Sequence, residues 1–532
     1  MGEDQSQSSG KGAVITPVKV DRLASWLEGY DEEKKQYLLD GFTHGFRVGY
    51  SGKVSSIIFN NHKSADSKPS IIDDYLEVEI KNKRIFGPLP SIPEQYHCAP
   101  LGLVPKKNKN DFRIIHDLSF PPGQSVNEFI PPEYTNVQYQ SVYDAVYMLS
   151  QICNGAVMSK TDIEKAFRLI PVHPDDQYLF CINWRGSFYV DRALQMGCSS
   201  SCQIFQAFAS AIKWISEAKL QIPTVNYLDD FMLGAATKAI GLNDLQRFLS
   251  MCADIGIPMS DKKTFPPENI MTFLGFEIDT VKREIRLPVE KIQQCRDEID
   301  HLLARKKTQL RNLQSVIGLL NFASQVILPG RAFLRRLIDQ TRGYRLPTFW
   351  IPLKNALLDL KMWKHFLDNH NGRVFFVDAN ILTNHDVSLY TDASGAKGFG
   401  AWFGDRWFYG EWSKWWKEQH IMLLELYPIV VALELWGADL GNKRLMLFTD
   451  NLSLVSVLNK QTSKDPLVMI LVRRLVLACL KSNVVVFAQH ISTSKNKLAD
   501  LLSRLQIQQF HLLHPTADRD PTPIPQLPES LN

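Results

Sequence analysis

Hydrophobic and polar positions between residues 91 and 285 follow two patterns, which predict short strands with helices between them. Five short apolar runs predict strands, at residues 112–118, 156–162, 223–225, 231–234 and 271–278. Residues 199–217 carry apolar side chains at helical spacing and begin with serines suited to N-capping. This order of elements indicates an α+β unit with helices on one face of a sheet.

The pattern becomes helical from Pro288, and a second strand-rich unit begins near Asp386. In that unit, three strands joined by short turns precede an apolar helix that contains Glu425. We expect its strands and helices at residues 387–392, 399–403, 407–412, 421–436, 445–450, 467–480, 484–488 and 497–505. Their βββαβα layout predicts a separate α/β unit.

The chain is therefore expected to have five parts. An N-terminal extension, partly disordered, carries a helical pattern for which packing or partner binding is the simplest role. The two strand-rich units follow, with the helical segment between them, and a Pro-rich tail that we expect to be disordered ends the sequence. The expected bounds are residues 1–90, 91–285, 286–385, 386–508 and 509–532.

Composition favours an intracellular protein. The 532 residues are 45% hydrophobic and 22% charged, as in ordinary globular proteins, and the net charge of +4 permits nucleic-acid binding. The eight cysteines form no CxxC pair and no zinc-ligand spacing, which favours free thiols in a reducing compartment. The sequence shows no signal-peptide pattern and, by our reading, no apolar run of membrane-spanning length, so we expect a cytoplasmic or nuclear location.

Two adjacent carboxylates, Asp229 and Asp230, lie at the tip of a predicted hairpin, and Asp162 ends a neighbouring predicted strand. Successive side chains of a strand point to opposite faces, so the pair converges only if the chain turns there. Buried carboxylates repel each other and lose water, and Mg²⁺, which prefers oxygen ligands, removes that cost. A solvated Asp-Asp turn is the simpler interpretation of the pair alone, but the apolar flanking residues argue against it.

A basic hairpin is predicted ahead of these strands, with Lys106 near its tip and Arg113 on its returning strand. Arginine offers a forked donor and lysine a point charge, so the two could hold a triphosphate. A solvated Lys-rich turn is the alternative interpretation.

Four acidic residues of the second unit fall on a first strand, a helix, a strand end and a last helix, namely Asp392, Glu425, Asp450 and Asp500. Carboxylates on these elements can meet at one point over the sheet, where they would suit two Mg²⁺ ions and hydrolysis of a phosphodiester. Each acid taken alone is more simply part of a solvated face, and Asp450 could cap the next helix.

Four motifs of the first unit occur in the order of the palm motifs of retroelement reverse transcriptases, which the chain resembles. They are Thr161-Asp162…Ala166-Phe167, Met196-Gly197…Ser200…Ile204-Phe205, Tyr227-Leu228-Asp229-Asp230 and Phe273-Leu274-Gly275-Phe276. One such motif is weak, whereas four in order behind a basic hairpin are specific. The resemblance implies a right-hand polymerase, with fingers and palm in residues 91–285 and thumb and connection in residues 286–385.

The resemblance also implies roles for individual residues. Two Mg²⁺ ions, with Mn²⁺ as an alternative, would be held by Asp162, Asp229, Asp230 and the backbone carbonyl of Ile163. Phe167 matches the bulky side chain that excludes a ribose 2′-hydroxyl, although taken alone it could equally be a core residue. The other matches would contact the triphosphate (Lys106, Arg113), the incoming nucleotide (Met196, Gly197), the pyrophosphate (Lys263, or Lys262) and the primer (Phe273, Leu274, Gly275, Phe276).

One position departs from the pattern of the retroviral relatives. They carry Gln where this chain has Met196, so a polar contact to the incoming nucleotide is missing here. We expect this change to affect the rate and fidelity of nucleotide addition.

The second unit is similar to the ribonuclease H of retroelements. The similarity lies in Tyr390-Thr391-Asp392-Ala393-Ser394, Glu425-Leu426, Phe448-Thr449-Asp450-Asn451 and Ala499-Asp500-Leu501-Leu502-Ser503-Arg504. It implies an RNase H-like domain at residues 386–508 that holds two Mg²⁺ ions and cuts the RNA strand of an RNA/DNA hybrid. We treat His490 as structural, because the glycine that usually follows the catalytic histidine is replaced.

Further stretches resemble the polyproteins of tyrosine-recombinase retrotransposons of the DIRS and Ngaro type, over residues 15–508. They include Met196-Gly197-Cys198-Ser199-Ser200-Ser201-Cys202, Leu319-Leu320-Asn321-Phe322-Ala323, Tyr427-Pro428-Ile429-Val430-Val431 and Gln461-Thr462-Ser463-Lys464. That family carries a tyrosine recombinase after the ribonuclease H, so we expect integration to be supplied separately or this copy to be truncated.

The leading hypothesis is an RNA-directed DNA polymerase with ribonuclease H, acting on an RNA template, a DNA primer, dNTPs and an RNA/DNA hybrid, with no membrane partner. The second is a catalytically silent, host-retained protein that binds nucleic acid. A DNA-templated polymerase is a third and weaker hypothesis. The carboxylates argue against the second, because no structural role requires all seven of them.

Overall fold

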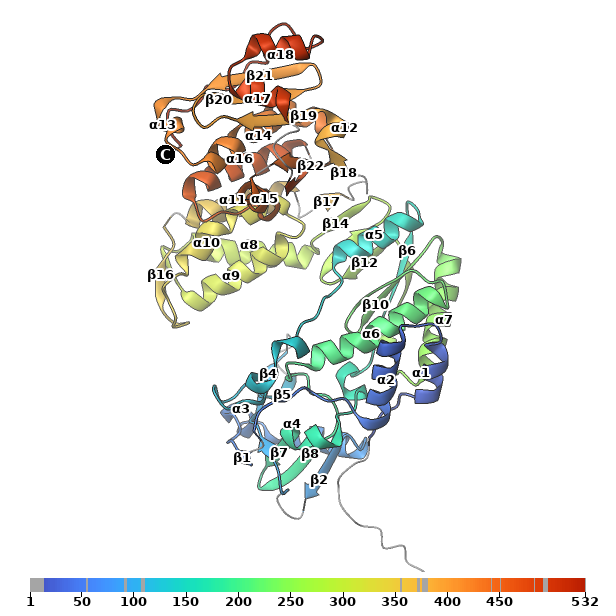
Figure 1. Cartoon of the computed structure of the whole chain (residues 1–532). Helices are drawn as coiled ribbons and strands as arrows, with labels where there is room; N and C mark the ends of the chain where they lie inside the picture. The colour runs from blue at the N-terminus through green and yellow to red at the C-terminus, as the bar shows by residue number, and fades with distance from the viewer. Residues whose placement is uncertain are drawn as a thin grey trace, which may run out of the picture. The chain divides into compact units, whose positions relative to one another are not determined.

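The computed structural model forms two compact units, Met1–Leu274 and Gly275–Asn532, whose elements are labelled in Figure 1. The boundary lies within the expected primer-contacting segment. The described residues are 14–53, 56–89, 93–106, 111–354, 356–370, 374–375, 381–441, 443–449, 451–482, 484–490 and 496–531.

The central sheet of the first unit is antiparallel, and its strands β11, β6, β10 and β9 are Phe265–Glu268, Val157–Asp162, Asp230–Ala235 and Thr224–Tyr227. β9 and β10 form the predicted hairpin, with Asp229 in the turn between them. The preceding turn residue, Leu228, has a φ of 51°, so the chain reverses there and Asp229 leaves the strand pattern.

Helices cover both faces of this sheet, so the expectation of helices on one face is wrong. Phe231 of β10 packs against Phe248 of α7, with 5.5 Å between ring centroids. Gly234 points the other way, and a Cβ there would lie 2.6 Å from Ile152 of α5. The three helices that cover the sheet are α5 (Val142–Ile152), α6 (Ser201–Ala218) and α7 (Lys238–Ile255).

A second sheet of the first unit has the strand order β1, β3, β7, β8 and β2, which are Ile57–Ile58, His97–Cys98, Cys181–Trp184, Ser187–Asp191 and Ile85–Leu89. The basic hairpin predicted from the sequence is present as β4 (Leu101–Pro105) and β5 (Phe112–His116). Short 3₁₀ helices lie between the helices and strands of this unit, at Val126–Phe129, Pro132–Tyr134, Ala166–Leu169 (η3), Pro174–Phe180 and Asp261–Lys263 (η5).

The first 90 residues contribute to the core of this unit. Leu23 and Leu27 are fully buried in the same hydrophobic cluster as Ile255, and the backbone N–H of Lys19 donates to the carbonyl of Ile255 at 2.7 Å. The helices here are α1 (Val20–Trp26), α2 (Glu32–His44), α3 (Lys63–Asp66) and α4 (Pro69–Lys81). The sequence pattern predicted the region of α1 and α2, but not α3 and α4, and not the integration of this segment into the core.

The second unit begins with a helical part. Its helices are α8 (Val289–Leu303), α9 (Leu310–Ala323), α10 (Arg335–Gln340) and α11 (Ala356–His370), with a 3₁₀ turn at Leu328–Phe333. Its short strands are β13 (Phe276–Asp279), β14 (Glu284–Arg286), β15 (Lys307–Gln309), β16 (Trp350–Pro352) and β17 (Val374–Phe375). The buried carboxylate of Asp359 on α11 connects this part to the rest of the unit, because Arg336 of α10 and Arg473 of α16 (Pro466–Ser482) lie 3.1 and 3.5 Å from its oxygens.

Two three-stranded sheets follow, one antiparallel and one parallel. The antiparallel sheet contains β19 (Leu389–Ala393), β20 (Gly398–Phe403) and β21 (Arg406–Glu411), and the parallel sheet contains β18 (Ile381–Thr383), β22 (Arg444–Thr449) and β23 (Val485–His490). The helices are α12 (Asn384–Val387), α13 (Lys414–Lys417), α14 (Ile421–Trp436), α15 (Leu452–Lys460), α16 (Pro466–Ser482), α17 (Lys497–Ser503) and α18 (Ile507–Leu513). The element order expected from the sequence is present, with β18, α12, α13 and α18 as additions.

The Pro-rich tail is ordered against this unit, contrary to the expected disorder of residues 509–532. The indole N–H groups of Trp407 and Trp416 donate to the carbonyls of Asp518 and Pro528, each at 2.7 Å. Buried tryptophans need an acceptor for the indole N–H, and the carbonyls of the tail supply it. The tail therefore depends on tertiary contacts that its own composition does not indicate.

Among the described residues, the segment Ile421–Leu440 is long and apolar enough to span a membrane, which our reading of the sequence missed. In the structure, 67% of its most apolar window is buried inside the protein. This segment, α14 with the 3₁₀ turn Gly437–Leu440, is therefore packed as a core helix.

Candidate active sites

The three carboxylates of the first unit lie together at one end of the central sheet. Asp162, the last residue of β6, is directly opposite Asp230, the first residue of β10. Asp229 lies in the adjoining turn, and its carbonyl accepts a hydrogen bond from the N–H of Ile163 at 3.1 Å. The strand register thus brings together residues far apart in the sequence, as the sequence predicted.

This arrangement is electrostatically costly. Asp162 is 5% exposed, and burial, together with the charge of Asp229 and a hydrogen bond with Asp230, raises its pKa to about 6 despite a lysine partner. Burial also raises the pKa of Asp229, and the charge of Asp230 acts in the same direction. The cluster therefore favours a nearby positive charge.

Two lysines supply positive charge in the structure. The ammonium of Lys263, on η5, donates to both carboxylate oxygens of Asp162 at 2.9 Å. Lys160 lies 3.4 Å from Asp230 Oδ2. The sequence predicted Lys263 at this site but not Lys160, although its position two residues before Asp162 on one strand places both on the same face.

Across the described residues, no group of three or more His, Cys, Asp or Glu side chains is arranged to hold a metal ion as it stands. The donor set nevertheless has the chemistry of a divalent cation site, because its carboxylates lie close together and the pKa values of Asp162 and Asp229 are raised. Both oxygens of Asp162 are bound to Lys263, so a cation there would have to displace that ammonium.

The two residues expected to select the nucleotide have different environments. Phe167, on η3, is 8% exposed, and its ring lies 5.2 Å from that of Phe205. Met196 is 64% exposed. Next to it, a Cβ on Gly197 would lie 2.8 Å from the carbonyl oxygen of His116, so a close backbone approach requires glycine there.

The expected triphosphate contacts lie on the β4–β5 hairpin. Lys106 donates to Asp111 Oδ2 at 2.9 Å, and Arg113 faces Val104 on the neighbouring strand. The lysine-rich tip between them, residues 107–110, lies outside the described residues. Within the described part of the chain, no hydrogen bond or ion pair joins Lys106 or Arg113 to the three carboxylates.

The expected primer-contacting residues form a tight turn. Phe273 ends β12 (Ile270–Phe273) and is fully buried, and Leu274 has a φ of 50°. In the second unit, Phe276 stacks on Phe322 with 4.4 Å between ring centroids. Gly275 has a φ of 81°, and a Cβ there would lie 2.9 Å from Phe322, so this glycine is required by both its conformation and its packing.

The acids of the second unit lie on neighbouring elements. Ser503 of α17 connects two of them, because its hydroxyl oxygen is 2.6 Å from Asp392 Oδ2 and 2.9 Å from the carbonyl oxygen of Asp500. Glu425, on α14, accepts a hydrogen bond from the hydroxyl of Thr449, at the end of β22, at 3.4 Å.

The fourth acid, Asp450, lies outside the described residues. Its neighbour Asn451 caps α15, accepting hydrogen bonds from the N–H groups of Ser453 and Leu454. The N-cap of α15 is therefore Asn451. Asp500 itself pairs with Arg504 at 2.7 Å.

Residues 104–278 match a protein family model described as "Reverse transcriptase (RNA-dependent DNA polymerase)". The chain is 26% identical over 230 residues to the Pro-Pol polyprotein of Feline foamy virus, which covers 43% of this chain and 18% of that protein. It is 25% identical over 227 residues to Protein P of Duck hepatitis B virus (isolate brown Shanghai duck S5), which covers 42% of this chain and 27% of that protein. The chain thus spans less than a third of the length of these relatives.

Two solved structures show the same fold. The foamy viral protease-reverse transcriptase dRH in complex with double-stranded DNA is 18% identical, with a TM-score of 0.50, over 92% of this chain and 84% of that one. The complex of the foamy viral protease-reverse transcriptase with an RNA/DNA hybrid is 17% identical, with a TM-score of 0.51, over 91% of this chain and 64% of that one. The predicted reverse transcriptase fold is thereby confirmed, and residues 104–278 form a reverse transcriptase domain like those of retroviral and foamy virus polyproteins.

Proposed function

We propose that this chain is an RNA-directed DNA polymerase that extends a DNA primer with dNTPs on an RNA template, and that residues 386–508 form a ribonuclease H. The observation that carries the first part is the cross-strand pair of Asp162 and Asp230 with Asp229 beside it. Raised pKa values, as found for Asp162 and Asp229, are a common signature of carboxylates at a functional site.

The polymerase site would use its own residues in distinct ways. Asp162, Asp229, Asp230 and the carbonyl of Ile163 would hold two Mg²⁺ (or Mn²⁺) ions, which would favour attack by the primer 3′-hydroxyl and departure of pyrophosphate. Lys263 would release Asp162 and turn its ammonium to the pyrophosphate, since it cannot neutralise both at once. Phe167 would exclude a ribose 2′-hydroxyl, and Lys106 and Arg113 would contact the triphosphate.

The remaining substrate contacts follow the same scheme. Met196 and Gly197 would lie against the incoming nucleotide, and Phe273, Leu274, Gly275 and Phe276 would hold the primer end. The template would be recognised by shape and backbone, because a copying enzyme cannot depend on the sequence it copies. The RNA/DNA hybrid and double-stranded DNA named for the similar foamy viral structures support such partners.

The nuclease site would consist of Asp392, Glu425, Asp450 and Asp500, with two Mg²⁺ ions that activate water for cleavage of the RNA strand. The contacts of Ser503 with Asp392 and with the Asp500 backbone support this assignment, because they bring two of the four acids onto adjoining elements.

We also propose a retrotransposon origin of the tyrosine-recombinase type and a cytoplasmic or nuclear site of action. The stretches around Cys198, Asn321 and Pro428 support this origin. Sequencing the genomic locus tests it: a neighbouring tyrosine-recombinase reading frame is expected, and an integrase frame in its place would contradict it.

A catalytically silent nucleic-acid-binding protein is the second candidate. The observation that favours it is the pair of hydrogen bonds that Lys263 donates to the two carboxylate oxygens of Asp162. Primer extension with Mg²⁺ on an RNA template separates the two. Wild type should extend the primer and Asp229→Asn should not, so equal behaviour of the two proteins would exclude the polymerase. A DNA-templated polymerase would extend on DNA and hardly at all on RNA.

The ribonuclease H assignment requires its own assay. Cleavage of an RNA/DNA hybrid should be lost in Asp450→Asn and kept in Asp229→Asn. If Asp450→Asn cleaves the hybrid like wild type, residues 386–508 are not a nuclease of this kind.

A further inference from the structure

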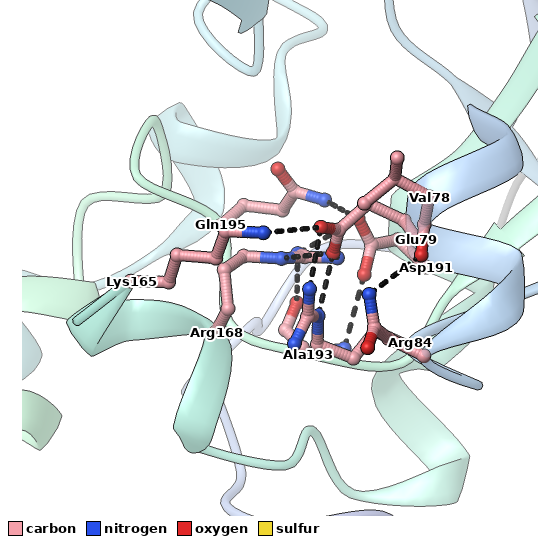
Figure 2. A network of polar contacts seen from close by, with 9 residues as sticks. Val78, Glu79, Arg84, Lys165, Arg168, Asp191, Ala193 and Gln195 are labelled. Carbon is pink, nitrogen blue, oxygen red and sulfur yellow. Dashed lines mark hydrogen bonds and ion pairs between the residues drawn. The ribbon is translucent and has the colours of Figure 1, made fainter. Parts of the chain in front are cut away.

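A buried ion network lies outside the carboxylate sites of the first unit (Figure 2). Glu79 on α4 is 3% exposed, and Asp191, the last residue of β8, is fully buried. The guanidinium of Arg168, on η3, bridges them: Nε and Nη2 donate to Glu79 at 3.0 and 2.8 Å, and Nη1 donates to Asp191 at 2.9 Å. Arg84 completes the network, donating to both Glu79 oxygens at 2.6 Å.

The buried carboxylates of this network are compensated by several positive groups together. The two carboxylates face two guanidinium groups, and Lys165 Nζ lies 3.9 Å from Glu79. Burial alone would raise the pKa of Glu79, but the hydrogen bonds of Arg84 and the charge of Arg168 hold that pKa below its ordinary value. Removing one partner of such a buried set leaves another charge unpaired, so the members hold one another in a fixed geometry.

The network adjoins the two segments that are proposed to contact the incoming nucleotide. Arg168 directly follows Phe167 on η3. At the other end, the side-chain amide of Gln195 donates to Asp191, and the residue after Gln195 is Met196. The backbone carbonyl of Gln195 is itself held, because it accepts from the hydroxyl of Ser201 at 2.5 Å and from the N–H of Cys198 at 3.3 Å.

We propose that Arg168 is a positioning residue of the polymerase site, which fixes Phe167 relative to Met196 and Gly197 and thereby sets the discrimination between deoxyribonucleotides and ribonucleotides. This inference rests on the proposed polymerase function. Arg168 acts through its bridge to Glu79 and Asp191 and is 13% exposed, so it need not touch the nucleotide. Arginine is required because its planar fork reaches two carboxylates, whereas the ammonium of a lysine is a single point charge.

Arg168→Lys tests the bridge while keeping the charge. We expect the ratio of kcat/KM for a dNTP to that for the matching rNTP to fall about tenfold, with most of the change in KM. The reason is that Phe167 would no longer be held at a fixed distance from Met196 and Gly197. Gln195→Leu removes only the hydrogen bond from Gln195 to Asp191, so the same ratio should fall less, by about threefold. Arg47→Lys is the matched control, since Arg47 bonds the buried Asp176 at 3.0 Å in the same unit, and it should leave the ratio unchanged.

Hydrogen exchange gives a readout that needs no catalysis. Backbone amides of residues 195–201 should exchange faster in Arg168→Lys than in wild type, and not in Arg47→Lys. If wild type extends primers but Arg168→Lys keeps both its nucleotide selectivity and its exchange rates, this inference fails alone. A wild type without primer extension overturns the proposed function and the selectivity claim together, and if Arg168→Lys does not fold, Gln195→Leu decides by the same two measurements.

Discussion

Asp162 and Asp230 of the first unit lie on facing strands, whereas among the described acids of the second unit Asp392 lies on a strand and Glu425 and Asp500 lie on helices. Strand register alone places Asp162 opposite Asp230. In the second unit, Asp392 and Asp500 are connected through Ser503, and a helix must pack correctly for that contact to form. Geometry set by backbone pairing depends little on single side chains, while geometry set by helix packing depends on the groups that dock the helix.

The two sets also differ in how their charge is compensated. Asp162 and Asp230 have lysine partners, at 2.9 and 3.4 Å. In the second unit Asp392 accepts from a hydroxyl, and Asp500 pairs with Arg504. A cation entering the first site therefore competes with the ammonium of Lys263. Four experiments test these differences between the two sites.

The largest expected effect is a clean separation of the two activities. Asp230→Asn should lower primer extension about a thousandfold and leave hybrid cleavage intact, because it removes a carboxylate that would hold the Mg²⁺ ions at the reacting atoms. Asp392→Asn should do the reverse. Both rates are measured on one protein preparation, and a loss of both activities in either variant would show that the sites are not independent.

A smaller effect is expected at Lys263, and it concerns the difference in charge compensation. Lys263→Met should lower kcat for primer extension about thirtyfold, since the pyrophosphate loses a cation. The same variant should reach half-maximal rate at less Mg²⁺, because Asp162 no longer binds an ammonium. Lys213→Met, which breaks the exposed pair with Glu217 at 2.6 Å, is the control. An unchanged Mg²⁺ requirement would contradict the competition.

Ser503 tests the dependence of the second site on helix docking. Ser503→Ala removes the hydrogen bond to Asp392 and should lower hybrid cleavage about tenfold, the loss expected for one hydrogen bond to a charged group. Thr516→Ala removes a comparable bond, from a hydroxyl to Asp405 at 2.8 Å, and should not affect cleavage. Equal cleavage by Ser503→Ala and wild type would mean that α17 is held by other contacts.

The sequence predicted the elements of the first site better than the residues that support them. Asp162, Asp229 and Asp230 follow from short strands and a turn, which are local patterns. Glu79 was missed because nothing in its own helix shows that it is buried beside Arg168, on η3. The ordered tail was missed for the same reason, since its contacts with Trp407 and Trp416 come from distant parts of the chain.

The smallest effect is on stability, and it tests whether the two lysines fully compensate the charge of the first site. The pKa of Asp162 is about 6 in the folded protein, above its ordinary value of 3.8. The stabilisation linked to its protonation is therefore fully present below the unfolded pKa and is lost as pH rises through about 6. Relative to Asp162→Asn, wild type in EDTA should lose about 2 kcal/mol between pH 4 and pH 8, measured by urea unfolding.

Asp254→Asn is the control of opposite sign for this measurement. Hydrogen bonds from Arg22 and Trp26 hold the pKa of Asp254 below its ordinary value, so the stability it contributes is present above the unfolded pKa and is lost as pH falls. At pH 8, Mg²⁺ should restore the stability that wild type lost and leave Asp162→Asn unchanged, because only the wild-type cluster offers all three carboxylates to the ion. If the difference in unfolding free energy between wild type and Asp162→Asn does not change with pH, the charges of this site are already balanced by Lys160 and Lys263.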